Sequence, residues 1–151
     1  MDYGLENRDE VFRLAGAAVV SAVDDREAVQ WLRAHFPFSS GHIDWETMPG
    51  ALLLPVVDHM APAAVSAGFE RSLAHVGAVD QQAVWVIWSD ICESLRMPVA
   101  ACRLALEPLL FVSPGTHFAS LEGGWCIEFD FFNQWHAGRS RGGPVINRSG
   151  D

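Results

Sequence analysis

The chain of 151 residues carries nineteen carboxylates against ten arginines, contains no lysine, and has a formal net charge of -9. Because nucleic acids are bound by neutralising their phosphates with lysine and arginine, this balance argues against a nucleic-acid ligand and favours a basic protein partner. The missing lysine excludes mechanisms that need a phosphate-loop, Schiff-base or dyad lysine. The length suits one domain with a sizeable core, and the 50% hydrophobic content leaves a homodimer open.

The compartment follows from the N-terminus, the apolar runs and the cysteines. No segment reaches the roughly 18 to 20 apolar residues of a membrane helix, and the acidic start MDYGLENRDE lacks the layout of a signal peptide. We therefore expect a cytoplasmic protein that does not contact a membrane. Cys92, Cys102 and Cys126 stand in apolar runs without a C-x-x-C spacing, which predicts buried reduced thiols and no zinc site.

In the first half of the chain the pattern predicts two helices and a strand. A helix is expected from about Asp25 to Phe36, with Asp24 as its N-cap. A second helix begins with Pro62 in its first turn and ends at Gly77, a residue suited to a left-handed C-terminal cap. The run 51–54 between turn residues predicts a buried strand. Residues 8–23 fit either helix or strand, and we favour helix.

In the second half, the apolar run 83–88 predicts a central strand that is buried on both faces. Ser89 and Asp90, with Glu93 three residues on, predict a short helix that Pro98 limits. Residues 99–113 fit helix and strand equally, with a break expected at Glu107-Pro108.

The clearest local pattern is a β-hairpin at about 116–132, where Gly123-Gly124 predicts a two-residue turn. Pairing Glu122 with Trp125 then places His117 opposite Asp130. One face of the hairpin is expected in the core, and it carries Trp125, Ile127, Phe129 and Phe131. The opposite face is expected to be solvated and carries His117, Glu128 and Asp130. The fold class is thus predicted as α+β, a single domain whose antiparallel sheet ends in this hairpin and packs against two or more helices.

After the hairpin the composition changes to glycine, arginine and serine. Such a segment is typical of a flexible tail. We therefore expect one globular domain over residues 1–137 and a tail over 138–151.

The group His117, Glu128 and Asp130 has two interpretations. Histidine beside carboxylates is a common arrangement in general acid–base catalysis and in metal coordination. A cross-strand pair on a solvated face is the more common arrangement, and no nucleophile accompanies the group. We accordingly expect no catalytic residues, no metal and no cofactor, and keep as an alternative a small hydrolase-like enzyme that uses His117 with Glu128 or Asp130.

A second acidic and aromatic patch lies at Asp44, Trp45 and Glu46. A tryptophan between carboxylates suits an interface, although a turn with a half-buried tryptophan has the same sequence. The residues expected to bind a partner are Asp44, Trp45, Glu46, His117, Glu128, Asp130 and Trp135.

The segment from Leu121 to Arg139, LEGGWCIEFDFFNQWHAGR, resembles the tryptophan-bearing terminal hairpins of bacterial immunity proteins of polymorphic and contact-dependent toxin systems. It covers about an eighth of the chain. The resemblance implies stoichiometric binding of a cognate toxin domain, often a basic nuclease, and assigns no residue a role. An acidic dimeric secretion chaperone, which would hold an extended partner in a surface groove, is the alternative from another class.

Overall fold

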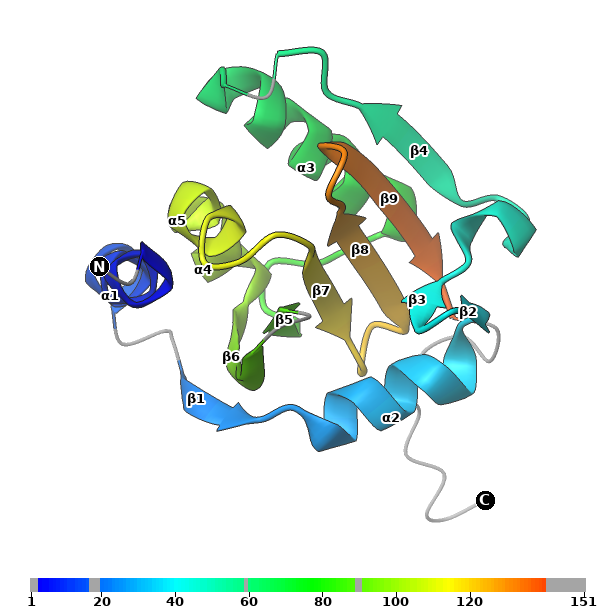
Figure 1. Ribbon diagram of the computed structural model, residues 1–151, viewed down its shortest axis with the longest axis horizontal. Helices are drawn as coiled ribbons and strands as arrows, with labels where there is room; N and C mark the ends of the chain where they lie inside the picture. Colours follow the sequence, from blue (N-terminus) through cyan, green and yellow to red (C-terminus); the bar gives the residue numbers. More distant parts are fainter. Residues whose placement is uncertain (1–2, 17–19, 59, 89–90, 141–151) are drawn as a thin grey trace.

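The computed structural model describes residues 3–16, 20–58, 60–88 and 91–140. Its helices are α1 (Tyr3–Ala15), α2 (Arg26–His35), the 3-10 turn η2 (Trp45–Thr47), α3 (Pro62–Val76), α4 (Val99–Leu104) and α5 (Leu106–Leu110) (Figure 1). Its strands are β1 (Val20–Asp24), β2 (Phe38–Ser39), β3 (His42–Ile43), β4 (Leu52–Pro55), β5 (Ala83–Trp88), β6 (Ile91–Pro98), β7 (Thr116–Ser120), β8 (Trp125–Phe129) and β9 (Gln134–Arg139).

In the described part of the chain, seven strands form one sheet in the order β1-β6-β5-β7-β8-β9-β4, while β2 and β3 pair separately. Every neighbouring pair in the large sheet is antiparallel. Helices cover this sheet, as Figure 1 shows. The structure therefore confirms the predicted α+β fold with an antiparallel sheet packed against helices.

Both faces of the sheet are buried, and each face has its own core. On the first face, α1, α3, α4 and α5 pack against the sheet around fully buried side chains that include Phe69, Phe118 and Trp135. On the second face, α2, the β2–β3 pair and η2 enclose Trp85, Ile87 and Cys126 with their own apolar residues. The all-apolar run of β5 requires this arrangement, because its side chains point alternately to both faces.

The two predicted helices form as expected. Helix α2 is one residue shorter than predicted at each end, and its N-cap is Asp25, not the predicted Asp24. Asp24 Oδ1 nevertheless accepts a hydrogen bond from the Arg26 amide at 2.9 Å. Helix α3 has Pro62 in its first turn, where the missing N–H has no helical partner to lose. It ends at Gly77, whose φ of +68° is the left-handed conformation that glycine adopts without strain.

The C-terminal hairpin is present, but its predicted pairing is wrong by two residues. Ser120 pairs with Trp125 and His117 pairs with Glu128, so a four-residue loop replaces the predicted Gly-Gly turn. The Ser120 side chain and carbonyl hold this loop, accepting from the amides of Gly123 at 3.0 Å and Gly124 at 2.9 Å. Because side chains alternate with a period of two, a two-residue shift leaves every side chain on its predicted face.

Other expectations are corrected or resolved by the structure. Glu93 lies in strand β6 and not in the predicted helix. The strand forms because β6 pairs with β5 and β1, and because Leu95 and Met97 alternate into the core. Ser89 and Asp90 lie outside the described residues. The ambiguous stretch 8–23 contains the end of α1 and then β1, and 99–113 contains α4 and α5.

The break that was predicted at Glu107-Pro108 occurs at Ala105, so Pro108 lies inside α5. Strand β4 has the predicted position but is an edge strand, with Leu53 half exposed. Phe131, assigned above to the core face, follows the end of β8 and is 54% exposed.

Residues 138–140, assigned above to a tail, belong to the domain. Strand β9 continues to Arg139, and Trp125 pairs with Arg139 across β8 and β9. The Arg139 guanidinium donates to the carbonyl oxygens of Val76 and Gly123, and the Ser140 amide donates to the Gly124 carbonyl at 2.8 Å. The remainder of the predicted tail, 141–151, lies outside the described residues.

Two matched substitutions test the first core. Phe118 is fully buried between Phe69 and Trp135, whereas Phe132 is 80% exposed. We expect Phe118→Ala to lower the free energy of unfolding by about 3–5 kcal/mol, because it leaves a cavity. Phe132→Ala should lower it by less than about 0.5 kcal/mol. Urea denaturation measures both, and a similar small loss for the two variants would contradict the packing described here.

Candidate functional site

A row of polar side chains crosses the second face of the sheet. His117 on β7, Glu128 on β8 and His136 on β9 lie directly opposite one another in register. Directly opposed residues of antiparallel strands share a face, so the three side chains stand side by side. We call His117, Glu128, His136 and the neighbouring Asp130 the polar row.

Glu128 is the centre of the polar row and is only 8% exposed. Its Oε1 accepts a hydrogen bond from Trp45 Nε1 at 2.6 Å, and its Oε2 lies 3.3 Å from His117 Nε2. Trp45 also stacks on the His136 ring, with 5.6 Å between centroids and an interplanar angle of 14°. A buried carboxylate is costly without such partners, so Trp45 both covers Glu128 and compensates part of its lost hydration.

Asp130 holds the turn between β8 and β9. Its Oδ1 accepts from the amides of Phe132 at 2.8 Å and Gln134 at 3.0 Å, and its Oδ2 lies 2.7 Å from His136 Nε2. The predicted partner of Asp130, His117, is paired with Glu128 instead. All four carboxylate oxygens of the polar row therefore have partners within the fold.

Burial controls the titration of the groups on this face. Desolvation lowers the pKa of His117 below its ordinary value of 6.5. The negative charge of Glu128 opposes this shift, whereas electrostatic repulsion from His42 and His136 adds to it. Burial, assisted by Glu128, raises the pKa of the neighbouring Cys126 thiol well above its ordinary range. His117 is thus kept neutral at pH 7, and Cys126 stays a thiol rather than a nucleophilic thiolate.

The structure separates the seven residues expected to bind a partner. Glu46 is exposed and Asp44 is half-buried, while Trp45 and Glu128 are buried and Trp135 lies in the first core. His117 and Asp130 keep 14% and 16% of their side-chain surface. The expectation that this face is solvated is therefore wrong, because α2 and residues 38–48 fold back over it. Trp45 and His136 complete the hydrogen-bonded network of the polar row. The sequence pattern around these two residues did not indicate that they contact it.

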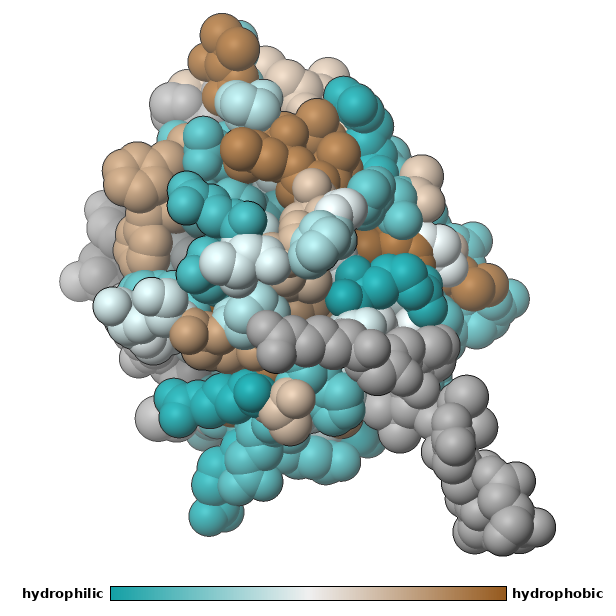
Figure 2. Space-filling model, turned by 90° about the vertical axis from the view of Figure 1, so that its right-hand side faces the viewer, coloured by the Kyte–Doolittle hydropathy of each residue, from teal (hydrophilic) through white to brown (hydrophobic). Residues whose placement is uncertain are grey.

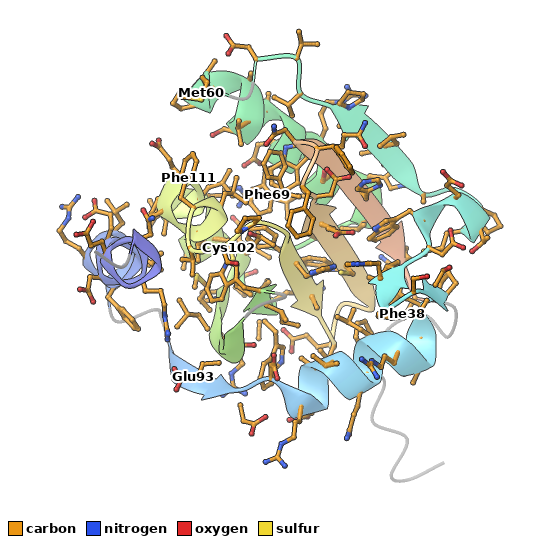
Figure 3. All side chains as sticks on the ribbon, viewed as in Figure 1. Phe38, Met60, Phe69, Glu93, Cys102 and Phe111 are labelled. Carbon is orange, nitrogen blue, oxygen red and sulfur yellow. The ribbon has the colours of Figure 1, made fainter. Side chains whose placement is uncertain are left out.

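A second candidate site, which the sequence analysis missed, is a groove of about 930 Å³ on the first face. It lies between α1, α5, the start of α3 and the turn after β8. Its rim carries large apolar side chains that are 54–75% exposed, and these are Met60, Leu104, Phe111 and Phe131. Figure 3 shows Met60 and Phe111 on the same side of the sheet as Phe69 and Cys102. We call this site the apolar groove.

The ionic groups that line the apolar groove are mostly carboxylates. Glu10, Glu107 and Asp130 line it together with one guanidinium, that of Arg103, and Glu10 is itself paired with Arg13. Arg103 donates to Glu70 at 2.9 Å and to Asp80, so its charge is already compensated. Glu107 is exposed and has no hydrogen-bond or ionic partner among the described residues. The groove therefore combines apolar walls with a net negative rim.

Apolar side chains are also exposed on the side of β4. Leu53 is 53% and Val57 98% exposed, and a shallower hollow of about 340 Å³ lies between β4 and α3. Figure 2, which faces this side of the molecule, shows hydrophobic patches separated by hydrophilic residues. This surface serves below as a control for the apolar groove.

The described residues contain no cluster of three or more His, Cys, Asp or Glu side chains that could hold a metal ion. Among the helices described, none combines the length and apolar character that crossing a bilayer requires. No known protein family matches the chain, and no match was found among the curated proteins.

The polar row predicts a specific pH dependence. Because the folded state lowers the pKa of His117, the unfolded chain binds a proton more readily, so the free energy of unfolding should fall as the pH drops below about 6.5. His117→Gln removes this titrating group, so the free energy of unfolding of the variant should decline less steeply with falling pH than that of the wild type. Urea denaturation across the pH range measures both slopes. Identical slopes would show that His117 titrates alike in both states.

Proposed function

We propose that this protein is a stoichiometric binding protein, an immunity protein that neutralises a basic bacterial toxin domain, such as a nuclease, in the cytoplasm. The observation that carries the proposal is the apolar groove, where exposed phenylalanine, leucine and methionine side chains stand together with three carboxylates. Clustered exposed apolar residues with a polar rim are typical of protein interaction sites.

The distribution of charge supports a basic partner. Arg8, Arg13, Arg26 and Arg103 each pair with carboxylates of the same chain. Several exposed carboxylates lack an ionic partner within the described residues, namely Glu6, Asp9, Glu27, Glu46, Asp58 and Glu107. Unpaired surface carboxylates accelerate the encounter with a positively charged protein.

The polar row supports binding over hydrolysis. A general base must reach the proton that it removes, and the oxygens of Glu128 and Asp130 are occupied by hydrogen bonds within the fold. Trp45 covers the row from the outer side. The arrangement fits a network that fastens residues 42–48 to the sheet.

The proposal requires that a toxin domain be encoded directly upstream of this chain, and it is tested by co-expressing that domain with the protein. We expect the wild-type protein to restore growth of cells that produce the toxin, because a one-to-one complex blocks the toxin's activity. Size-exclusion chromatography with light scattering should show that complex. Failure to protect would overturn the proposal. An obligate dimer that holds a secreted protein would favour the secretion chaperone. Enzymatic turnover by the wild-type protein that is lost in both His117→Ala and Glu128→Gln would favour the hydrolase-like enzyme.

Charge steering gives a further expected result. The association rate of the protein with its toxin should fall markedly between about 0.01 M and 0.15 M salt, because the Debye length shrinks from about 30 Å to about 8 Å. The dissociation rate should change much less. Stopped-flow fluorescence across a salt series measures both rates. A salt-independent association rate would show that the exposed carboxylates do not guide the encounter.

A further inference from the structure

We infer that the apolar groove binds an amphipathic helix of the partner, with the apolar face of that helix in the groove and its arginine or lysine residues at the rim. This inference rests on the proposed function and specifies the contact surface of the complex.

The rim residues indicate that the occupant is a macromolecule. Met60 is 75% exposed, Leu104 65% and Phe111 57%, although each is large and apolar. A small ligand within the groove would leave the outer surfaces of these side chains in water, whereas a protein segment lying across the groove would cover them. The groove volume of about 930 Å³ has room for several side chains of such a segment.

The walls favour a helix as the bound segment. The groove is lined by residues of α1, α3, α4 and α5, by Phe129 at the end of β8 and by turns, and none of its lining residues belongs to the edge strand β4. An added β-strand requires a free strand edge, which this site does not offer. A helix instead inserts side chains spaced three or four residues apart into a groove between helices.

Charge selects a basic occupant. Glu107 lines the groove without an ionic partner among the described residues. Asp130 lines it with its oxygens hydrogen-bonded in the fold, and Glu10 is paired with Arg13. The one guanidinium that lines the groove, that of Arg103, is outnumbered by its own partners Glu70 and Asp80, so the groove keeps a net negative charge. A second copy of this chain would bring the same carboxylates and a net charge of -9, so like charges would oppose its docking. A helix with cationic residues beside its apolar face complements both properties of the groove.

The test compares matched leucine substitutions in the complete protein with the toxin domain that it neutralises. Leu104→Glu changes the rim of the groove, and Leu53→Glu makes the same change on β4 at a similar exposure of 53%. We expect Leu104→Glu to raise the dissociation constant at least about 30-fold, as at an interface hot spot, and Leu53→Glu to raise it less than about threefold. The added negative charge favours a basic partner at both sites, so a loss at Leu104 reports the apolar contact.

Isothermal titration calorimetry measures these constants, and circular dichroism confirms that the variants are folded. A photo-crosslinker at Phe111 should label the toxin at positions of one helical face. Equal effects of the two leucine variants, no effect of either, or labelling of a strand would overturn the groove inference while wild-type neutralisation upholds the proposed function. A wild-type dimer that Leu104→Glu dissociates would identify a second copy as the occupant and also overturn it. A wild-type protein that does not neutralise the toxin would overturn the proposed function itself.

Discussion

The enclosed carboxylate of Glu128 is the constraint on which the second face of the sheet depends. The side-chain alternation of β8 places Ile127 in the first core and therefore turns Glu128 to the opposite side. At 8% exposure it needs hydrogen-bond donors, and it has them in Trp45 and His117. Since Trp45 belongs to η2, this one carboxylate helps to fix residues 42–48 over the sheet. The segment that looked like a free acidic patch is thereby part of the second core.

Covering both faces also determines where an interaction surface remains. The second face is closed by α2, the β2–β3 pair and η2, whose apolar residues are buried against it. On the first face, α1 and α5 lie apart from the start of α3 (Figure 1), and residues of these three helices line the groove. Phe111 follows α5 and Phe131 follows β8, so both rim residues come from element ends. More than half of the surface of each of these two side chains is exposed, which leaves them open to the proposed contact.

The sequence predicted those features that depend on neighbouring residues. Pro62 and Gly77 mark the ends of α3 through their own backbone preferences, and the alternation around Trp125 assigns its face whatever the register. Strands β6 and β9 were missed because partners distant in sequence stabilise them: β6 lies between β1 and β5, and β9 between β8 and β4. The polar row was half predicted, since His117 and Glu128 share a hairpin, whereas Trp45 reaches Glu128 from 83 residues away. The groove has no local signal, because α1, α3 and α5 contribute to it from three separate parts of the chain.

Carboxylates of the same chain thus have different physical roles, and burial decides which. Glu128 lies within a low-dielectric core, so its charge is tied to hydrogen bonds that stabilise the fold. Glu107 is exposed at the rim of the groove, where its field extends into solvent and reaches an approaching protein. In the proposed complex, the negative charge that favours a basic partner therefore lies at exposed carboxylates such as Glu107 and not at the enclosed Glu128. Leu104 and Phe111 at the rim of the groove are more than half exposed, so substitutions there can be chosen without disturbing the enclosed network around Glu128.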